Sequence, residues 1–150
     1  MKIIDCITYC GEDLLLKIRF ETLFDKVDKF VIVEANKFFN GESKPRYFNI
    51  NKFEKYKKKI IYIPVMDMPD GDNPWVRENF QRNCISRGLV NAAKDDLILI
   101  SDLDEIPNLD QISKFNLNMR YAVFKQKHFY YKINLQSQKN PFGMEVEFVL

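Results

Sequence analysis

The sequence predicts one α/β domain with a mostly parallel β-sheet and helices on both faces of that sheet. Three observations support this fold class. Segments rich in β-branched and aliphatic residues alternate with segments whose apolar residues recur at helical spacing. The apolar strand segments are continuous, which is typical of strands covered on both faces. The 150 residues, of which 46% are hydrophobic and 29% charged, suffice for one packed core.

The first part of the chain has strand–helix–strand order. Residues 2–8 predict a strand, because they are rich in β-branched residues and few in number. Residues 12–27 predict an amphipathic helix, and Arg19 among its apolar positions predicts an internal ion pair. Residues 29–35 predict a second buried strand, and a loop with turn residues follows at 36–45.

The middle of the chain continues the alternation. Residues 50–59 predict a short polar helix, and residues 60–65 predict a third buried strand. A loop rich in proline, glycine and aspartate at 66–74 leads into a second long helix over 75–93. Residues 96–101 (DLILIS) predict the fourth strand.

The last third of the chain predicts smaller elements. A short helix is expected near 108–115, followed by two aromatic strands at about 119–125 and 128–134. The sequence contains no internal repeat, low-complexity segment or domain linker. We therefore expect residues 1–150 to form a single domain.

Three acidic residues follow the predicted fourth strand at its carboxyl end. Asp102, Asp104 and Glu105 fall within four positions, where ligands of parallel sheets bind. Asp102 and Asp104 would point to the same side of an extended segment. Such carboxylates suit Mg²⁺ or Mn²⁺, which complete their shell with phosphate oxygens. The alternative is a solvated turn whose acids cap the following helix.

Other candidate ligand residues lie at strand ends or on the second long helix. Thr8 and Glu34 end the first two predicted strands, and Glu34 would contact a ribose or base, or else be a surface acid. Arg77 and Arg82 flank Glu78 on the helix. They would reach a diphosphate or form ion pairs on the helix surface.

Composition argues against several classes of protein. The net charge of +2 is too small to favour nucleic acid, and the basic segment 52–59 predicts a solvated helix face. No stretch has the length of a membrane span or the pattern of a secretory signal. The three cysteines lack a framework spacing, so free thiols are expected. We therefore expect a soluble, cytoplasmic protein without a membrane segment or a nucleic-acid partner.

Four segments, in this order, resemble glycosyltransferase family 17. They read VDKFVIVEANKFFNGESKPRYF (27–48), KIIYIPV (59–65), WVRENFQRN (75–83) and DDLILISDLDEIP (95–107). The ordered combination of V-E-A-N, G-x-x-K-P and S-D-x-D-E-I-P is far more specific than D-x-D alone. The resemblance covers residues from about 1 to 135.

This resemblance implies a GT-A-like, Rossmann-like fold of the nucleotide-sugar transferases. It also implies metal-dependent transfer of N-acetylglucosamine from UDP-N-acetylglucosamine to a glycan acceptor, with inversion. Asp102 and Asp104 would correspond to the D-x-D that holds Mn²⁺ (or Mg²⁺) and the diphosphate. The physics agrees, because a bound cation stabilises the negative charge that develops on a departing diphosphate.

The sequence departs from the family pattern at residues 137–150, which read SQKNPFGMEVEFVL. We therefore expect a C-terminally truncated domain. An inverting transferase needs a general base at the acceptor hydroxyl, and no residue before 135 identifies itself as that base. Two alternatives stay open: a non-catalytic remnant that binds a nucleotide sugar, and a metal-dependent phosphotransfer enzyme.

Overall fold

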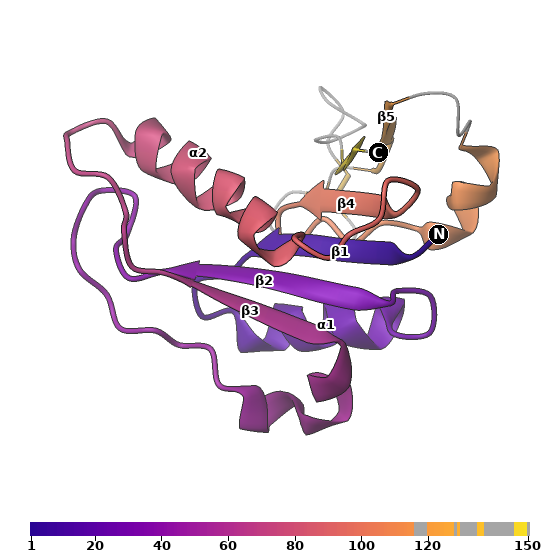
Figure 1. Ribbon diagram of the computed structural model, residues 1–150, viewed down its shortest axis with the longest axis horizontal. Helices are drawn as coiled ribbons and strands as arrows, with labels where there is room; N and C mark the ends of the chain where they lie inside the picture. The colour runs from indigo at the N-terminus through magenta and orange to yellow at the C-terminus, as the bar shows by residue number, and fades with distance from the viewer. Residues whose placement is uncertain (116–119, 128, 130–134, 137–145, 150) are drawn as a thin grey trace.

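The described residues form one six-stranded sheet in the order β3-β2-β1-β4-β6-β5 (Figure 1). The first four strands run parallel, whereas β6 pairs antiparallel with both β4 and β5. The strands are β1 (Ile3–Thr8), β2 (Lys29–Ala35), β3 (Ile60–Val65), β4 (Leu97–Ser101), β5 (Tyr121–Phe124) and β6 (Val146–Val149). The computed structural model describes residues 1–115, 120–127, 129, 135–136 and 146–149.

The strand order creates a topological switch point between β1 and β4. The chain passes from β1 through α1 (Asp13–Leu23) to β2 and then β3 on one side, and β4 pairs on the other side of β1. Ligands of open α/β sheets bind outside the carboxyl ends of the strands at such a point. The fold therefore places a binding crevice beside the residues that follow β1 and β4.

Helices cover both faces of the sheet, as predicted (Figure 1). Successive strand residues point to opposite faces, so each strand contributes to two apolar layers. On one face, α1 and the 3₁₀ helix η1 (Ile50–Lys59) pack on the sheet through Leu16, Phe20, Leu23, Phe53 and Tyr56. On the other face, the 3₁₀ helix η2 (Cys84–Gly88) packs through Cys84 and Ile85.

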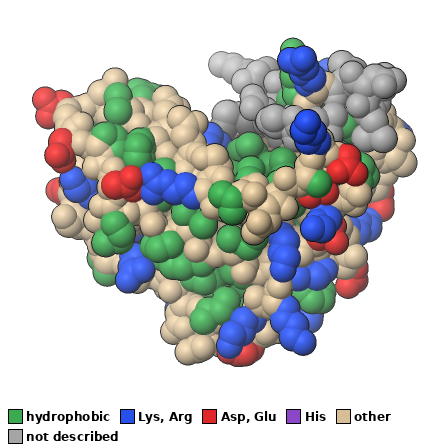
Figure 2. Space-filling view, in the orientation of Figure 1, with side chains coloured by type: hydrophobic (Ala, Val, Ile, Leu, Met, Phe, Trp, Pro, Cys, Tyr) green, Lys and Arg blue, Asp and Glu red, His purple; other side chains and the backbone are tan. Residues whose placement is uncertain are grey.

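Ion pairs fasten η1 to α1. Lys52 pairs with Asp13, and Lys55 pairs with Glu21. The ammonium group of Lys59 donates to two carbonyl oxygens just after α1, where a positive charge complements the helix dipole. Lys and Arg side chains gather together with acidic ones at the lower edge of Figure 2, where Figure 1 places η1. This basic segment is thus an ion-paired, solvated helix face.

The prediction of one long helix over 75–93 is wrong in its second half. The helix α2 (Pro74–Asn83) ends at Asn83, and the chain continues as the tighter helix η2. This tighter helix places Gly88 directly against β2. A Cβ placed on Gly88 would lie only 2.5 Å from Cγ1 of Val31, so the backbone approaches the sheet more closely than a side chain would allow.

Two of the remaining elements agree with the sequence, whereas β6 was not predicted. The predicted short helix is the 3₁₀ helix η3 (Leu109–Lys114), and the first aromatic strand is β5. The second, at 128–134, lies outside the described residues except for Phe129. Cys6, Cys10 and Cys84 are free thiols, and only Cys10 is exposed. Among the described residues, no helix combines the length and the apolar character needed to cross a membrane.

Gly88→Ala tests the close contact between η2 and β2. The added methyl group would overlap Val31, so the free energy of unfolding should fall by about 1–3 kcal/mol. Urea denaturation followed by circular dichroism measures this change. Ser86→Ala in the same helix, whose side chain is exposed, is the matched control and should stay close to the wild type. Wild-type stability of Gly88→Ala would contradict the proposed close packing.

Candidate functional site

A cavity of about 470 Å³ opens where β1 and β4 end, at the switch point. Five parts of the chain line it together: the turn after β1, the start of α1, the loop after β2, one side of α2 and the turn after β4. The lining residues that matter here are Thr8, Cys10, Phe38, Phe39, Arg82, Asp102 and Asp104. The structure thus brings together four of the predicted ligand residues: Thr8, Arg82, Asp102 and Asp104.

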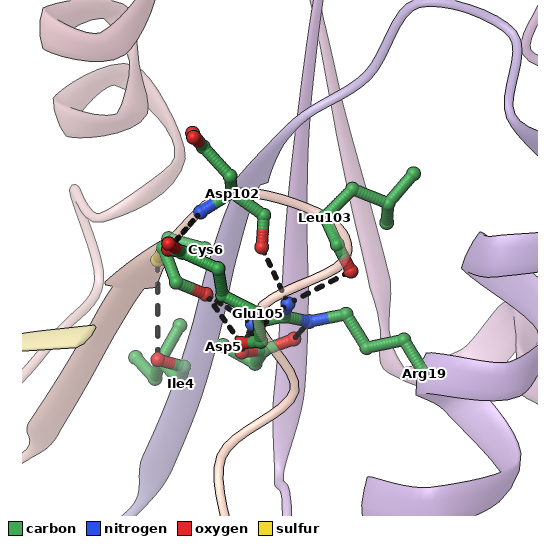
Figure 3. A network of polar contacts seen from close by, with 8 residues as sticks. Ile4, Asp5, Cys6, Arg19, Asp102, Leu103 and Glu105 are labelled. Atoms are coloured by element: carbon green, nitrogen blue, oxygen red, sulfur yellow. Dashed lines mark hydrogen bonds and ion pairs between the residues drawn. The ribbon is translucent and has the colours of Figure 1, made fainter. Parts of the chain in front are cut away.

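A buried ion pair lies beneath this cavity (Figure 3). Arg19 of α1 bonds both carboxylate oxygens of Asp5 on β1, with Nε at 2.8 Å and Nη2 at 2.7 Å. Both side chains are 0% exposed. A two-point contact between guanidinium and carboxylate is among the stronger hydrogen-bonded pairs in proteins. The predicted internal ion pair of Arg19 is confirmed.

The same arginine holds the backbone of the turn after β4. Its Nη1 donates to the carbonyl oxygens of Asp102 and Leu103 at 2.8 and 3.1 Å, and to that of Glu105 at 3.2 Å. Its Nη2 also donates to the Ser101 hydroxyl at 2.6 Å. Figure 3 shows these turn carbonyls converging on the guanidinium. Arg19 thus adds a charged donor to three carbonyl groups of the turn, of which those of Asp102 and Glu105 also accept bonds within the turn, and it fixes the course of the turn.

Asp102, Asp104 and Glu105 have different positions in this turn. Asp102 and Asp104 line the cavity. Glu105 instead turns back, and its Oε2 accepts a hydrogen bond from the Asp102 N–H at 3.1 Å. Burial raises the pKa of Glu105, and the charges of Asp102 and Asp104 raise it further. The acids do not cap η3, because the side chain of Asn108 does.

Arg82 is the cation nearest to the first of these acids. Its Nη2 lies 2.9 Å from Oδ1 of Asp102 and 3.5 Å from Oε1 of Glu78, one turn earlier on α2. The predicted helix-surface ion pair with Glu78 is therefore present. Asp102 is a second partner that the sequence did not predict. Arg82 also lines the cavity, so it is placed to contact a bound anion.

Glu34 does not line the cavity and is not a surface acid. Its fully buried carboxylate accepts bonds from Tyr62 Oη at 2.8 Å, from the N–H groups of Tyr47 and Phe48 at 2.7 and 3.2 Å, and from Lys44 Nζ at 3.3 Å. Four donors fill the acceptor positions of both oxygens. Glu34 therefore anchors the segment after β2 to the sheet instead of contacting a ribose or base.

Arg77 also proves to be a structural anchor. It is 2% exposed, and its Nε donates to the Phe39 carbonyl oxygen at 2.7 Å. Its Nη1 donates to the carbonyl oxygen of Gly71. These bonds tie the loop after β2 and the loop before α2 to the same helix. Arg77 is buried and does not line the cavity. The prediction of a diphosphate contact and the prediction of a surface ion pair are therefore both wrong.

Sequence reasoning missed several residues that line the cavity. Cys10 follows β1 directly, and Lys37, Phe38 and Phe39 follow the V-E-A-N segment at the end of β2. Lys44 of the G-x-x-K-P segment also lines the cavity. The rule that ligands bind at the carboxyl ends of strands would have found these loops, because it applies to the segment after each strand.

Asp102 and Asp104 suit a divalent cation whose remaining ligands come from the phosphate groups of a bound substrate. Across the described part of the chain, no group of three or more His, Cys, Asp or Glu residues is arranged to hold a metal ion. Mg²⁺ is commonly bound by one or two carboxylates plus substrate phosphates. Asp102 and Asp104, which both line the cavity, would be the residues to hold such a cation, and a nucleoside diphosphate would supply the other oxygens.

A mostly parallel α/β sheet with this cavity at its switch point is consistent with the fold of an α/β nucleotide-sugar transferase. The family model of "Glycosyltransferase family 17" matches residues 1–137. The chain belongs to glycosyltransferase family 17. This confirms the resemblance carried by the four sequence segments.

Three relatives carry the name β-1,4-mannosyl-glycoprotein 4-β-N-acetylglucosaminyltransferase. The protein of Homo sapiens is 31% identical over 121 residues, which cover 74% of this chain and 23% of the relative. Those of Rattus norvegicus and Mus musculus are also 31% identical, with 22% of each relative covered. The chain thus spans less than a quarter of the length of these relatives. No solved structure matches the chain.

Arg19→Met tests the buried pair beneath the turn. The change leaves the Asp5 carboxylate buried without its partner, so the free energy of unfolding should fall by about 3–5 kcal/mol. Chemical denaturation gives the value. Arg87→Met is the matched control, because Arg87 forms an exposed pair with Asp67 outside the cavity, and its loss should change stability little. Equal effects of the two changes would contradict a special role of Arg19.

Proposed function

We propose that this chain provides the donor-binding part of a glycosyltransferase that transfers N-acetylglucosamine from UDP-N-acetylglucosamine to a glycan acceptor. The proposal includes a divalent cation, Mn²⁺ or Mg²⁺, and inversion at the anomeric carbon. One observation carries it: Asp102 and Asp104 line a cavity at the switch point, on a turn fixed by Arg19. Family membership and the names of the relatives support the choice of sugar and acceptor.

The cavity supplies complementary surfaces for a nucleotide sugar. Its volume of about 470 Å³ lies within the usual range for small-ligand sites. Phe38 and Phe39 offer apolar faces for a base or sugar, since both residues line the cavity and each is 37% exposed. Arg82 offers a guanidinium, whose planar fork matches phosphate oxygens. Aromatic and cationic groups therefore face the two acids that would hold the cation.

The residues of the turn prepare the site for the charge of the departing UDP. A divalent cation, when bound, stabilises the negative charge that develops on the diphosphate. Asp102 and Asp104 would hold that cation, and Arg19 keeps their backbone in place through three carbonyl bonds. Preorganised charges of this kind need no rearrangement during the reaction. The turn therefore serves the leaving-group side of the transfer.

The general base of the inverting reaction is not assigned to a residue. Two further carboxylates, Glu12 and Glu78, line the cavity. Glu12 accepts a hydrogen bond from the Cys10 N–H at 2.9 Å, and Glu78 pairs with Arg82. Both acids have partners within the cavity wall. The proposal therefore assigns the donor side of the reaction to this chain.

Product analysis separates this function from the two alternatives. Labelled UDP-N-acetylglucosamine is incubated with the chain, Mn²⁺ and a mannose-terminated glycan. Sugar transfer or release of UDP supports a transferase. Binding of UDP without either supports a protein that only binds the nucleotide sugar, and release of phosphate from simple phosphoesters supports phosphotransfer.

Asp104→Asn tests the role of the D-x-D acids. The amide keeps the volume but is a poorer ligand for a hard cation, so the affinity for UDP in Mn²⁺ should fall at least about tenfold. The melting temperature should hold or rise, because repulsion from Asp102 and Glu105 is relieved. Calorimetric titration of UDP at fixed Mn²⁺ gives the affinity. Asp110→Asn, an exposed acid outside the cavity, is the control. Unchanged UDP affinity in Asp104→Asn would show that the acids form only a solvated turn and do not bind the cation.

Protection of Cys10 tests whether the nucleotide occupies the cavity. Cys10 is exposed and lines the cavity, whereas Cys6 and Cys84 are buried. UDP with Mn²⁺ should therefore slow modification of Cys10 by a maleimide, measured by mass spectrometry. Partial burial raises the pKa of the Cys10 thiol, so the rate should continue to increase with pH above the usual thiol range. Equal rates with and without UDP would place the nucleotide elsewhere.

A further inference from the structure

Arg82 stands between two acids at the mouth of the cavity. The same nitrogen, Nη2, contacts Asp102 at 2.9 Å and Glu78 at 3.5 Å. Glu78 lies on the same helix, whereas Asp102 belongs to the D-x-D turn after β4. The arginine therefore spans from α2 to a carboxylate that the proposed function assigns to cation binding.

The contact between Arg82 and Asp102 is of a kind that exchanges readily. The side chains of both residues are 37% exposed, so water screens the attraction between them. By contrast, the buried pair of Arg19 and Asp5 is sealed from solvent. A guanidinium also repels a divalent cation that approaches the same carboxylate. Arg82 and a cation thus compete for Asp102.

We propose that Arg82 is an exchange residue: it pairs with Asp102 in the free protein and moves to the diphosphate when the cation and nucleotide bind. This inference rests on the proposed function of the cavity. Glu78 keeps hold of the guanidinium during the exchange, because it lies one helical turn away on α2. The planar fork of arginine matches phosphate oxygens, so the move replaces one anionic partner with another.

Two consequences follow from this exchange. Divalent cation alone binds weakly, because it must displace Arg82 from Asp102. Cation and nucleoside diphosphate favour each other, since the diphosphate removes the competing guanidinium, and such coupling is reciprocal. The exchange also selects a diphosphate over a monophosphate, because the second phosphate gives Arg82 its new partner. Arg82 is therefore a specificity-determining residue for the diphosphate group.

Arg82→Gln gives effects of opposite sign on the two ligands. Affinity for Mn²⁺ alone should rise about two- to fivefold, the range for an exposed ion pair. Affinity for UDP at saturating Mn²⁺ should fall about tenfold, the scale of a lost charged hydrogen bond. Affinity for UMP should fall much less. Electron paramagnetic resonance of free Mn²⁺ measures the first quantity, and calorimetry measures the other two.

Two further variants serve as controls. Arg87→Gln breaks an exposed pair with Asp67 outside the cavity and should leave all three affinities unchanged. Arg82→Lys keeps the charge but loses the planar fork. It should therefore hold Mn²⁺ affinity near that of the wild type while binding UDP less tightly. Thermal melts establish that each variant is folded.

Each outcome decides the inference. Tighter Mn²⁺ binding together with weaker UDP binding in Arg82→Gln supports it. Unchanged or weaker Mn²⁺ binding overturns the exchange, and equal losses for UDP and UMP overturn the selection for a diphosphate. If the wild type binds UDP with Mn²⁺ but Arg82→Gln behaves identically, the proposed function stands and the inference fails. If the wild type binds neither ligand, both fail.

Discussion

The buried pair of Arg19 and Asp5 is the interaction on which the arrangement of the site depends. Two charges removed from water destabilise a fold unless their hydrogen-bonding capacity is filled. Here both Asp5 oxygens are bonded, and the guanidinium also bonds Ser101 and three turn carbonyl oxygens. The pair therefore joins α1, β1 and the turn after β4 into one unit. The direction in which Asp102 and Asp104 face follows from that unit.

The other walls of the cavity are fastened in a similar way. Buried Glu34 bonds the backbone at Tyr47 and Phe48, and buried Arg77 bonds the carbonyl oxygens of Phe39 and Gly71. Buried charged side chains thus anchor the loop after β2 and the turn after β4. These anchors add to the few backbone bonds within the loops, such as the bridge between Lys37 and Ser43, and together they give the site its shape. Asp102, Asp104 and Arg82 are not buried in such anchors, so their charged groups can contact a ligand in the cavity.

The sequence predicts the four parallel strands and the position of the acids well, because both depend on local pattern. The bounds of β2 and β3 agree with the continuous apolar runs at 29–35 and 60–65. The roles of Glu34 and Arg77 could not be predicted, since most of their partners are distant in the chain. The residue type alone also does not show whether a charged side chain is buried. The close approach of Gly88 to β2 is likewise a long-range contact that the local pattern does not show. Local pattern therefore locates the site, and long-range contacts decide which of its charges are free.

The D-x-D turn, held by Arg19, is proposed to receive a divalent cation together with a nucleoside diphosphate. Anomalous diffraction at the manganese edge, with crystals grown in UDP and Mn²⁺, locates both ligands in one experiment. We expect one manganese peak in the cavity, coordinated by Asp104, with Asp102 in the same shell directly or through water, and completed by diphosphate oxygens. A manganese peak away from both carboxylates, or UDP bound outside this cavity, would show that the turn does not hold the cation.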